Sequence, residues 1–217
     1  MNAAFNQAKN EYEDLVGALN IMADFLEGVA RKGNISFSKR RFLMQYDCML
    51  QYSLMQLAVS DASLDIDELY FIKDITIYSD FIDYINHEYQ TNISWQTIWN
   101  SNEGEISSFL HNIRFEMDKI KDEFCAAFAF YDYLDEENDC LGMIKNKTLL
   151  ILAHLSCVDG NLSPKEENSV KNNYIVDILM GIQNEIQHYT KNAQNPKSAP
   201  CEDGSLKSLY KNKVKKN

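Results

Sequence analysis

The chain has few residues that interrupt regular secondary structure. Only three of its 217 residues are proline and eight are glycine. Because these two residue types end or kink helices and strands, their scarcity predicts long regular elements. A chain of this length can bury roughly 70–75% of the surface that its unfolded form exposes, so we expect a hydrophobic core of ordinary size.

The sequence also lacks the long apolar run that a membrane-spanning helix requires. Its uninterrupted apolar runs are only a few residues long, whereas about 20 such residues span a bilayer. The first fourteen residues are polar and acidic, without the basic and apolar regions of a signal peptide. We therefore predict a cytoplasmic protein with no transmembrane segment.

The five cysteines do not form a pattern typical of disulfides or zinc sites. Their number is odd, and no two stand at CxxC spacing. Cys48, Cys125 and Cys157 lie in apolar helical runs, where a free thiol packs like a small hydrophobic side chain. These features are typical of a protein from a reducing compartment.

Basic residues are concentrated at one end of an acidic chain. Residues 191–217 carry seven Lys against Glu202 and Asp203, a net charge of +5. Subtracting this from the total of −11 leaves −16 for residues 1–190. A body this acidic repels nucleic acid, so we expect none to bind there. We predict one helical domain over residues 1–190 and a basic, flexible tail over residues 191–217.

Apolar residues recur at three- and four-residue spacings along most of the chain, which is the pattern of helices with one buried face. The longest such pattern, residues 105–134, predicts a central helix of about 45 Å at 1.5 Å per residue. Ile75 to Tyr78 could form a short strand, but the helical neighbours argue against it. Together these patterns predict an all-α helical bundle. The predicted helices cover residues 5–31, 42–58, 65–75, 80–85, 94–99, 105–134, 141–158 and 164–186.

Polar residues stand where these helices begin. Ser36 or Ser38 can cap the second helix, Ser79 or Asp80 the fourth, and Ser94 the fifth. Such caps satisfy backbone N–H groups that a helix leaves without an internal acceptor. Their positions therefore support the helix starts that the apolar spacing predicts.

One sequence motif occurs twice, with a constant offset of 98 residues between the two copies. In each copy an apolar helix ends at an aspartate, a short link carries a leucine, and a capped helix begins. In the second copy, Gly160 suits the helix end, and Ser163 with Glu166 forms a capping box. Asp65 and Glu68 repeat this box in the first copy. The two copies are Asp61-Ala62-x-Leu64-Asp65-x-x-Glu68 and Asp159-Gly160-x-Leu162-Ser163-x-x-Glu166.

This motif between two helices resembles that of the TerB-like family, which is named after tellurite-resistance proteins. The resemblance covers residues 42–78 and 142–188, and Ala62 departs from the glycine of the family pattern. It implies two pseudo-symmetric helix-turn-helix units and a role in stress or phage-defence systems. It also implies that a divalent cation such as calcium binds in the acidic links. By resemblance, the metal ligands are Asp61, Asp65, Glu68, Asp159 and Glu166.

The same acids also have a purely structural interpretation. The aspartates can end helices while Asp65 and Ser163 cap the helices that follow, with no metal bound. Elsewhere Trp95 and Trp99 stand one turn apart, and we expect them to pack against the core. An exposed apolar patch for a partner is the alternative for this pair.

The chain carries no sequence motif of a known catalytic centre. His87, His111, His154 and His188 are isolated, and no HExxH, GxSxG, P-loop or GxGxxG motif occurs. We therefore expect a non-catalytic interaction or accessory module with a protein partner, with or without a divalent cation. One alternative is a metal-dependent helical hydrolase that uses the same acids. Another is an inhibitor-type protein whose acidic surface binds a basic partner. A homo-oligomer is compatible with each of these.

Overall fold

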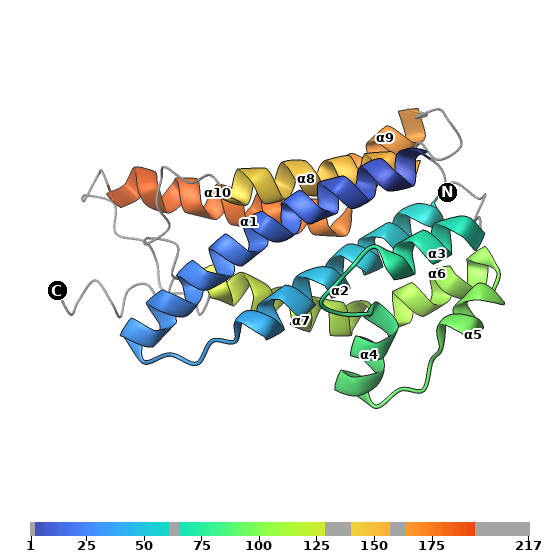
Figure 1. The fold of residues 1–217 in the computed structure, drawn as a ribbon, viewed down its shortest axis with the longest axis horizontal. Coiled ribbons are helices and arrows are strands. Elements are labelled where there is room, and N and C mark those ends of the chain that lie inside the picture. The colour runs from blue at the N-terminus through green and yellow to red at the C-terminus, as the bar shows by residue number, and fades with distance from the viewer. Residues whose placement is uncertain (1–2, 61–65, 129–139, 157–163, 194–217) are drawn as a thin grey trace.

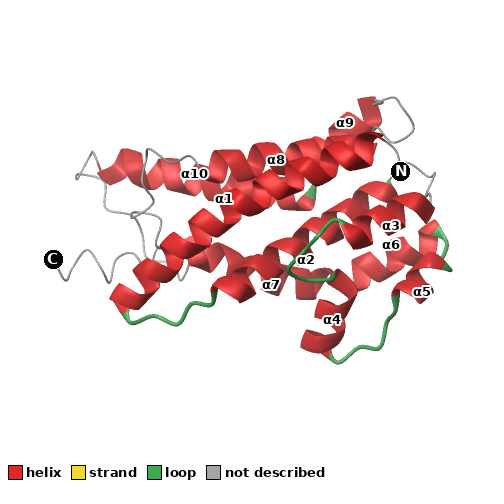
Figure 2. Cartoon of the chain, viewed as in Figure 1, coloured by secondary structure: helices red, strands yellow, loops and turns green. Residues whose placement is uncertain are grey.

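A computed structural model describes residues 3–60, 66–128, 140–156 and 164–193. This part of the chain is a bundle of helices without a strand, which confirms the predicted all-α class (Figure 1, Figure 2). No helix in it is long and apolar enough to cross a membrane. The helices are α1 (Ala3–Gly33), α2 (Lys39–Ala58), α3 (Ile66–Asp74), α4 (Phe81–Tyr89), α5 (Trp95–Trp99), α6 (Glu103–Asn112), α7 (Arg114–Ala127), α8 (Cys140–Ser156), α9 (Pro164–Lys171) and α10 (Tyr174–Ala193).

Helix α2 is the centre of the bundle. It contacts α1, α3, α4, α6, α7, α8, α9 and α10. Fifteen of its 20 residues are buried, so it lacks the broad polar face of a surface helix. The apolar spacing predicted one buried face, but the structure also buries Gln45, Asp47, Gln51 and Ser53. These buried polar side chains must find partners inside the protein.

The most extensive helix pair in the described part is α1 with α8. The buried side of α1 is the apolar stripe that its three- and four-residue spacing predicted. Lys147 of α8 ties the pair together, because its Nζ lies 2.6 Å from Glu11 and 2.7 Å from Asp14. Helix α1 ends where predicted, and Asn34 takes the left-handed conformation with a φ of 52°.

The predicted helix over residues 105–134 is two helices, α6 and α7, so the prediction of one long central helix was wrong. The division lies at Ile113, whose φ of −89° and ψ of 3° leave the helical region. The break lets Ile106 of α6 and Phe124 of α7 both join the core around α2. Residues 129–134 of the predicted helix lie outside the described residues.

The predicted helix over residues 164–186 is also two helices, α9 and α10. Between them, buried Asn173 donates its side-chain N–H to the Ser53 carbonyl oxygen at 3.0 Å. The Ile175 N–H donates to the Ser53 hydroxyl at 3.2 Å. Helix α2 therefore supplies acceptors for the start of α10, which lets the chain change direction there.

The two related units that the repeat predicted stay a prediction. Their helices are present, and the ends of α2 and α8 lie at the same end of the molecule as the starts of α3 and α9 (Figure 1). The links themselves, residues 61–65 and 157–163, lie outside the described residues, as do residues 194–217 of the predicted tail. Helix α10 extends to Ala193, three residues into that tail.

Three helix starts follow the predicted caps. Of the two serines that could cap α2, Ser38 does so and accepts the Arg41 N–H at 3.2 Å. Asp80 caps α4 and Ser94 caps α5, as predicted. Asp80 also accepts the Trp95 indole N–H at 2.6–2.7 Å, which ties the start of α5 to the start of α4.

Asp47 of α2 holds the segment of residues 75–80 that connects α3 to α4. Its carboxylate accepts hydrogen bonds from the Tyr78 N–H at 2.8 Å and the Ser79 N–H at 3.2 Å. The Tyr12 hydroxyl of α1 donates to the same carboxylate at 2.7 Å. A buried carboxylate needs such donors to offset the loss of water. Asp47 therefore joins α1, α2 and the 75–80 segment.

Gln51, one turn further along α2, holds both ends of the same segment. Its amide donates to the carbonyl oxygens of Ile72 at 2.7 Å and Lys73 at 3.1 Å. Its side-chain oxygen accepts the Phe81 N–H at 2.5 Å. Because side chains of α1 and α2 take up its backbone groups, the 75–80 segment forms neither a strand nor a helix, and the strand interpretation is excluded.

Burial gives Asp47 an unusual titration. It raises the pKa of the carboxyl from an ordinary 3.8 to about 6, although the hydrogen bonds from Tyr12 and the backbone lower it in part. A pKa that is higher in the folded than in the unfolded protein stabilises the fold most when the group is protonated. The contribution of Asp47 is therefore complete below about pH 3.8 and is lost as the pH rises through about 6.

We predict that Asp47→Asn removes this pH dependence. The quantity compared is the free energy of unfolding of the unchanged protein minus that of the variant. Between about pH 4 and pH 7 this difference should fall by roughly 2–3 kcal/mol, since one pKa unit corresponds to about 1.4 kcal/mol. Urea unfolding followed by circular dichroism measures it. Asp122→Asn, which removes a carboxylate that is 77% exposed, controls for the lost charge. The same difference is measured between the unchanged protein and Asp122→Asn. If it changes with pH as much as the difference for Asp47→Asn does, the pH dependence does not come from Asp47.

Candidate functional site

The predicted metal ligands lie almost entirely outside the described residues. Asp61, Asp65 and Asp159 are outside, and only the backbone of Glu166 is described, in α9. Glu68 lies partly buried in the first turn of α3. The structure therefore neither brings these five residues together nor separates them. In the regions that it does describe, no group of three or more His, Cys, Asp and Glu residues could hold a metal ion.

The cysteines in the described regions are packing residues. Cys48 and Cys140 are buried and Cys125 is partly buried, and none of these three is in a disulfide. Burial raises the pKa of the Cys48 thiol well above its ordinary value, and the nearby Asp47 carboxylate adds to the effect. A thiol that resists ionisation is a poor nucleophile. Cys157 lies outside the described residues.

The two tryptophans pack as a pair against the core, as predicted. Their ring centroids are 6.4 Å apart. Trp95 is buried, and Trp99 is partly buried against Tyr70 at 4.7 Å between ring centroids. Lys73 lies 5.3 Å from the Trp99 ring centroid and covers part of it. The pair therefore does not form the exposed apolar patch that was the alternative.

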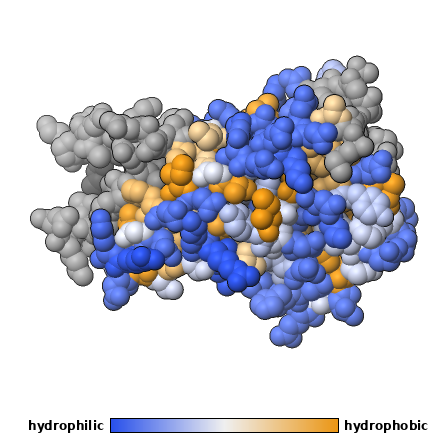
Figure 3. Space-filling view, in the orientation of Figure 1, coloured by the Kyte–Doolittle hydropathy of each residue, from blue (hydrophilic) through white to orange (hydrophobic). Residues whose placement is uncertain are grey.

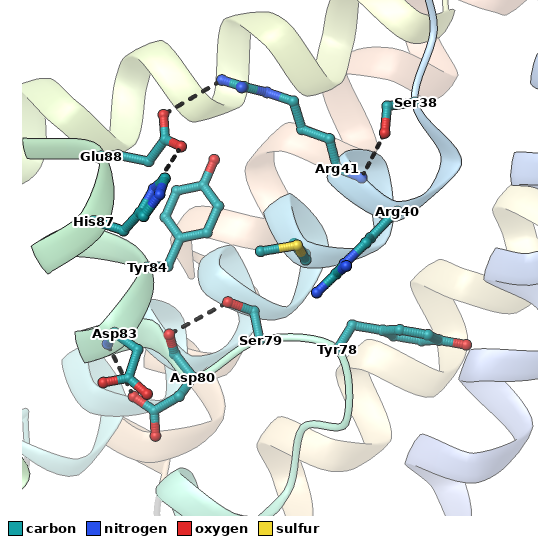
Figure 4. Close-up of a pocket in the computed structure, with 11 residues that line it drawn as sticks. Ser38, Arg40, Arg41, Tyr78, Ser79, Asp80, Asp83, Tyr84, His87 and Glu88 are labelled. Atoms are coloured by element: carbon teal, nitrogen blue, oxygen red, sulfur yellow. Dashed lines mark hydrogen bonds and ion pairs between the residues drawn. The ribbon is translucent and has the colours of Figure 1, made fainter.

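A groove that the sequence did not predict crosses the start of α2. One pocket of about 650 Å³ lies between the start of α2, the 75–80 segment and α4 (Figure 4). A second pocket of about 590 Å³ lies between α1, the end of the α1–α2 link and α2. Each volume is ordinary for a ligand site. Because Ser38, Arg40 and Tyr78 line both pockets, we treat the pair as one feature, the Arg40 groove.

Arg41 joins the helices around this groove. Its guanidinium lies 2.8 Å from Glu123 of α7 and 3.5 Å from Glu88 of α4. Gln45 donates to the same Glu123 oxygen at 2.6 Å. Exposed ion pairs of this kind contribute roughly 0–1 kcal/mol to stability. Their role here is to position α2, α4 and α7 relative to one another.

Arg40 differs from both of its neighbours. Lys39 pairs with Asp24 at 2.6 Å and Arg41 pairs as above, but no ion pair or hydrogen bond joins the Arg40 guanidinium to another described residue. Figure 4 shows the Arg40 side chain pointing into the pocket beside Tyr78 and away from Arg41. The structure thus presents one arginine to the groove without a bound partner.

The position of these three cations in α2 is electrostatically unfavourable. Residues 39–41 form the first turn of the helix, which contains no acidic residue. The N-terminus of a helix carries a partial positive charge and favours anions. Acids from other helices neutralise the first and third cations, whereas the second, Arg40, keeps its charge next to the helix end.

The opposite wall of the groove, on α4, is acidic. The Asp80 carboxylate is already bound by Trp95 and by the backbone of α4, and its burial raises its pKa above the ordinary value. Glu88 pairs with Arg41, and the exposed His87 lies 3.4 Å from it. Asp83 is exposed at the same wall. The groove therefore has a positive side on α2 and a negative side on α4.

The sequence did contain a signal for this site. Residues 28–46 include five basic residues and no acidic one, and they contain three of the four arginines of the chain. Averaging the charge over residues 1–190 hid this local cluster. The sequence could not show which of these cations the fold pairs with acids, because Asp24, Glu88 and Glu123 come from three other helices.

The resemblance to the TerB-like family stays a prediction. The residues of its better copy, 159–166, lie largely outside the described residues, and α8 and α9 show only that helices flank them. Comparison with known proteins finds no protein-family model, no curated protein and no solved structure that matches this chain.

Proposed function

We propose that the protein is a non-catalytic interaction module that binds a segment of a protein partner in the Arg40 groove. One observation carries this proposal: the groove combines an unpaired arginine with exposed apolar side chains beside it. Apolar surface rimmed by polar residues is typical of protein interaction sites.

Three large apolar residues near the groove are exposed. Ile21 is 58%, Ile35 42% and Ile77 66% exposed. Ile21 follows Asn20, which lines the groove, and Ile77 precedes Tyr78, which also lines it. Asn20 donates a hydrogen bond to the Tyr78 hydroxyl at 2.7 Å, so α1 and the 75–80 segment meet there. Ile21 and Ile77 are therefore the exposed apolar residues next in sequence to the two groove residues that meet there.

The molecular surface agrees with this arrangement. Figure 3 shows apolar side chains at the middle of the face on which the 75–80 segment crosses α2, with strongly hydrophilic side chains around them. The two pockets of about 650 and 590 Å³ extend on either side of Arg40. A peptide segment fits such an elongated surface better than one compact small molecule does.

We predict that folded protein selects binders from a displayed library of random 12-residue peptides and that Ile77→Asp weakens their binding at least tenfold. A carboxylate at this position would lie in the apolar contact, and tenfold corresponds to about 1.4 kcal/mol. Phe115→Asp on α7 is the matched control, since Phe115 is 67% exposed and Ile77 66%.

Fluorescence polarisation of the selected peptides measures their affinities, and a thermal melt checks that both variants remain folded. Binding that survives Phe115→Asp but not Ile77→Asp supports the groove as the site. Equal loss in both variants, no loss in either, or a library that yields no binder would each overturn the proposal.

A divalent-cation site in the acidic links is a second proposal. It is supported by the arrangement of the flanking helices, because the ends of α2 and α8 and the starts of α3 and α9 lie at one end of the bundle (Figure 1). A hard cation needs several oxygen ligands that converge on one point. Two acidic links that approach each other could supply them.

We predict that one of Ca²⁺, Mg²⁺, Mn²⁺ or Zn²⁺ raises the melting temperature by roughly 5–10 °C over protein in chelator. A ligand of the native state at 100 times its dissociation constant adds about 2.7 kcal/mol, which corresponds to such a shift for this size. Asp159→Ala with Glu166→Ala should abolish the shift. Glu167→Ala, which only removes an ion pair to Lys171, should retain it. If no cation raises the melting temperature, the acidic residues of the two links serve only as helix caps.

A further inference from the structure

We propose that the partner segment of the Arg40 groove carries an acidic side chain that binds Arg40, flanked by apolar side chains that cover Ile21 and Ile77. This inference rests on the proposed function and adds the chemistry of the ligand. It follows from the charges that the fold leaves unpaired, from the backbone at the start of α2 and from the apolar border of the groove.

The charge argument begins with the local composition. The net charge of the protein is −11, yet residues 28–46 hold five basic residues and no acidic one. Within this cluster the fold pairs Arg31 with Glu27, Lys39 with Asp24, and Arg41 with Glu123. Arg40 lines both pockets and pairs with no described residue.

The chemistry of Arg40 selects the kind of anion. A guanidinium presents planar, paired N–H donors that match the two oxygens of a carboxylate. In the first turn of α2, Ser38 accepts the Arg41 N–H, but no described acceptor takes the N–H groups of Lys39 and Arg40. These backbone donors and the positive helix end favour the same negative group. A carboxylate beside Arg40 would therefore meet donors from both side chain and backbone.

The opposite wall gives the ligand a direction. Asp83 and Glu88 on α4 would repel an acidic side chain placed there, whereas Arg40 lies across the pocket from Asp83 (Figure 4). The acid of the ligand must therefore lie on the α2 side. Its apolar neighbours would then cover Ile77, which is 66% exposed and precedes Tyr78 of the groove, and Ile21, which is 58% exposed and follows Asn20. Apolar side chains of the ligand that cover these residues would remove apolar surface from water, which favours binding.

Three synthetic pools of fluorescent 12-residue peptides test this inference. The pools share the same random mixture of apolar and small residues and differ only at the central position, which is Glu, Gln or Lys. We predict that the Glu pool binds about tenfold more tightly than the Gln pool, with the Lys pool weakest, because the Arg40 guanidinium attracts a carboxylate and repels an ammonium group. Fluorescence polarisation measures the three affinities.

Arg40→Gln and Lys32→Gln, which change the net charge by the same amount, separate the effect of Arg40 from general electrostatic attraction. Arg40→Gln should abolish the preference for Glu over Gln, and Arg40→Glu should reverse it in favour of Lys. Lys32→Gln removes an exposed cation of the same cluster that does not line the groove, and it should leave the preference intact. Because Arg40 has no described partner and lies at the positive end of α2, its replacement should not lower the melting temperature.

Each other outcome contradicts a defined part of the argument. A preference for Glu that survives Arg40→Gln would show that Arg40 does not bind the acid. If the three pools bind equally and Ile77→Asp weakens them all, the groove is a peptide site but its ligand does not need an acidic side chain. No binding by any pool would overturn both the ligand and the proposed function.

Discussion

The buried carboxylate of Asp47 is the contact on which the position of the groove depends. It accepts the N–H groups of Tyr78 and Ser79, which line the groove, and the hydroxyl of Tyr12 from α1. A carboxylate removed from water destabilises a fold unless donors surround it, and these three donors offset that cost in part. Without them, the middle of the 75–80 segment would lose its attachment to α2, and only the contacts of Gln51 at its two ends would remain. Both pockets would then lose Tyr78 as a wall.

The same helix that holds the segment also supplies the charge of the groove. Arg41 is committed to Glu123 and Glu88, which keeps α7 and α4 in place around the start of α2. Arg40, one residue earlier, points to the other side and stays available. Successive residues of a helix are about 100° apart around its axis, so neighbours in sequence face different surroundings. This geometry separates two adjacent arginines, of which Arg41 joins helices and Arg40 is available for the binding role that we propose.

The sequence predicted most helices because their signals are local. Apolar spacing marked α1, α2 and α8, and the caps Ser38, Asp80 and Ser94 marked three starts. The breaks at Ile113 and Asn173 were missed for different reasons. Ile113 is apolar and continues the helical spacing on both sides, so the pattern conceals the turn. Asn173 ends a helix through a bond to Ser53, which is 120 residues away in the chain.

What the sequence determined by itself is the all-α class, the places of most helices and the local concentration of basic residues, since each depends on residues within a turn or two of one another. Only the tertiary structure decided that α2 buries polar residues and that Asp47 binds a segment 31 residues further along. It also decided that, of Arg31, Arg40 and Arg41, Arg40 is the one that pairs with no other described residue. These outcomes depend on donors and acids from other helices. Their positions follow from packing in three dimensions, which the spacing of residues along one helix does not contain.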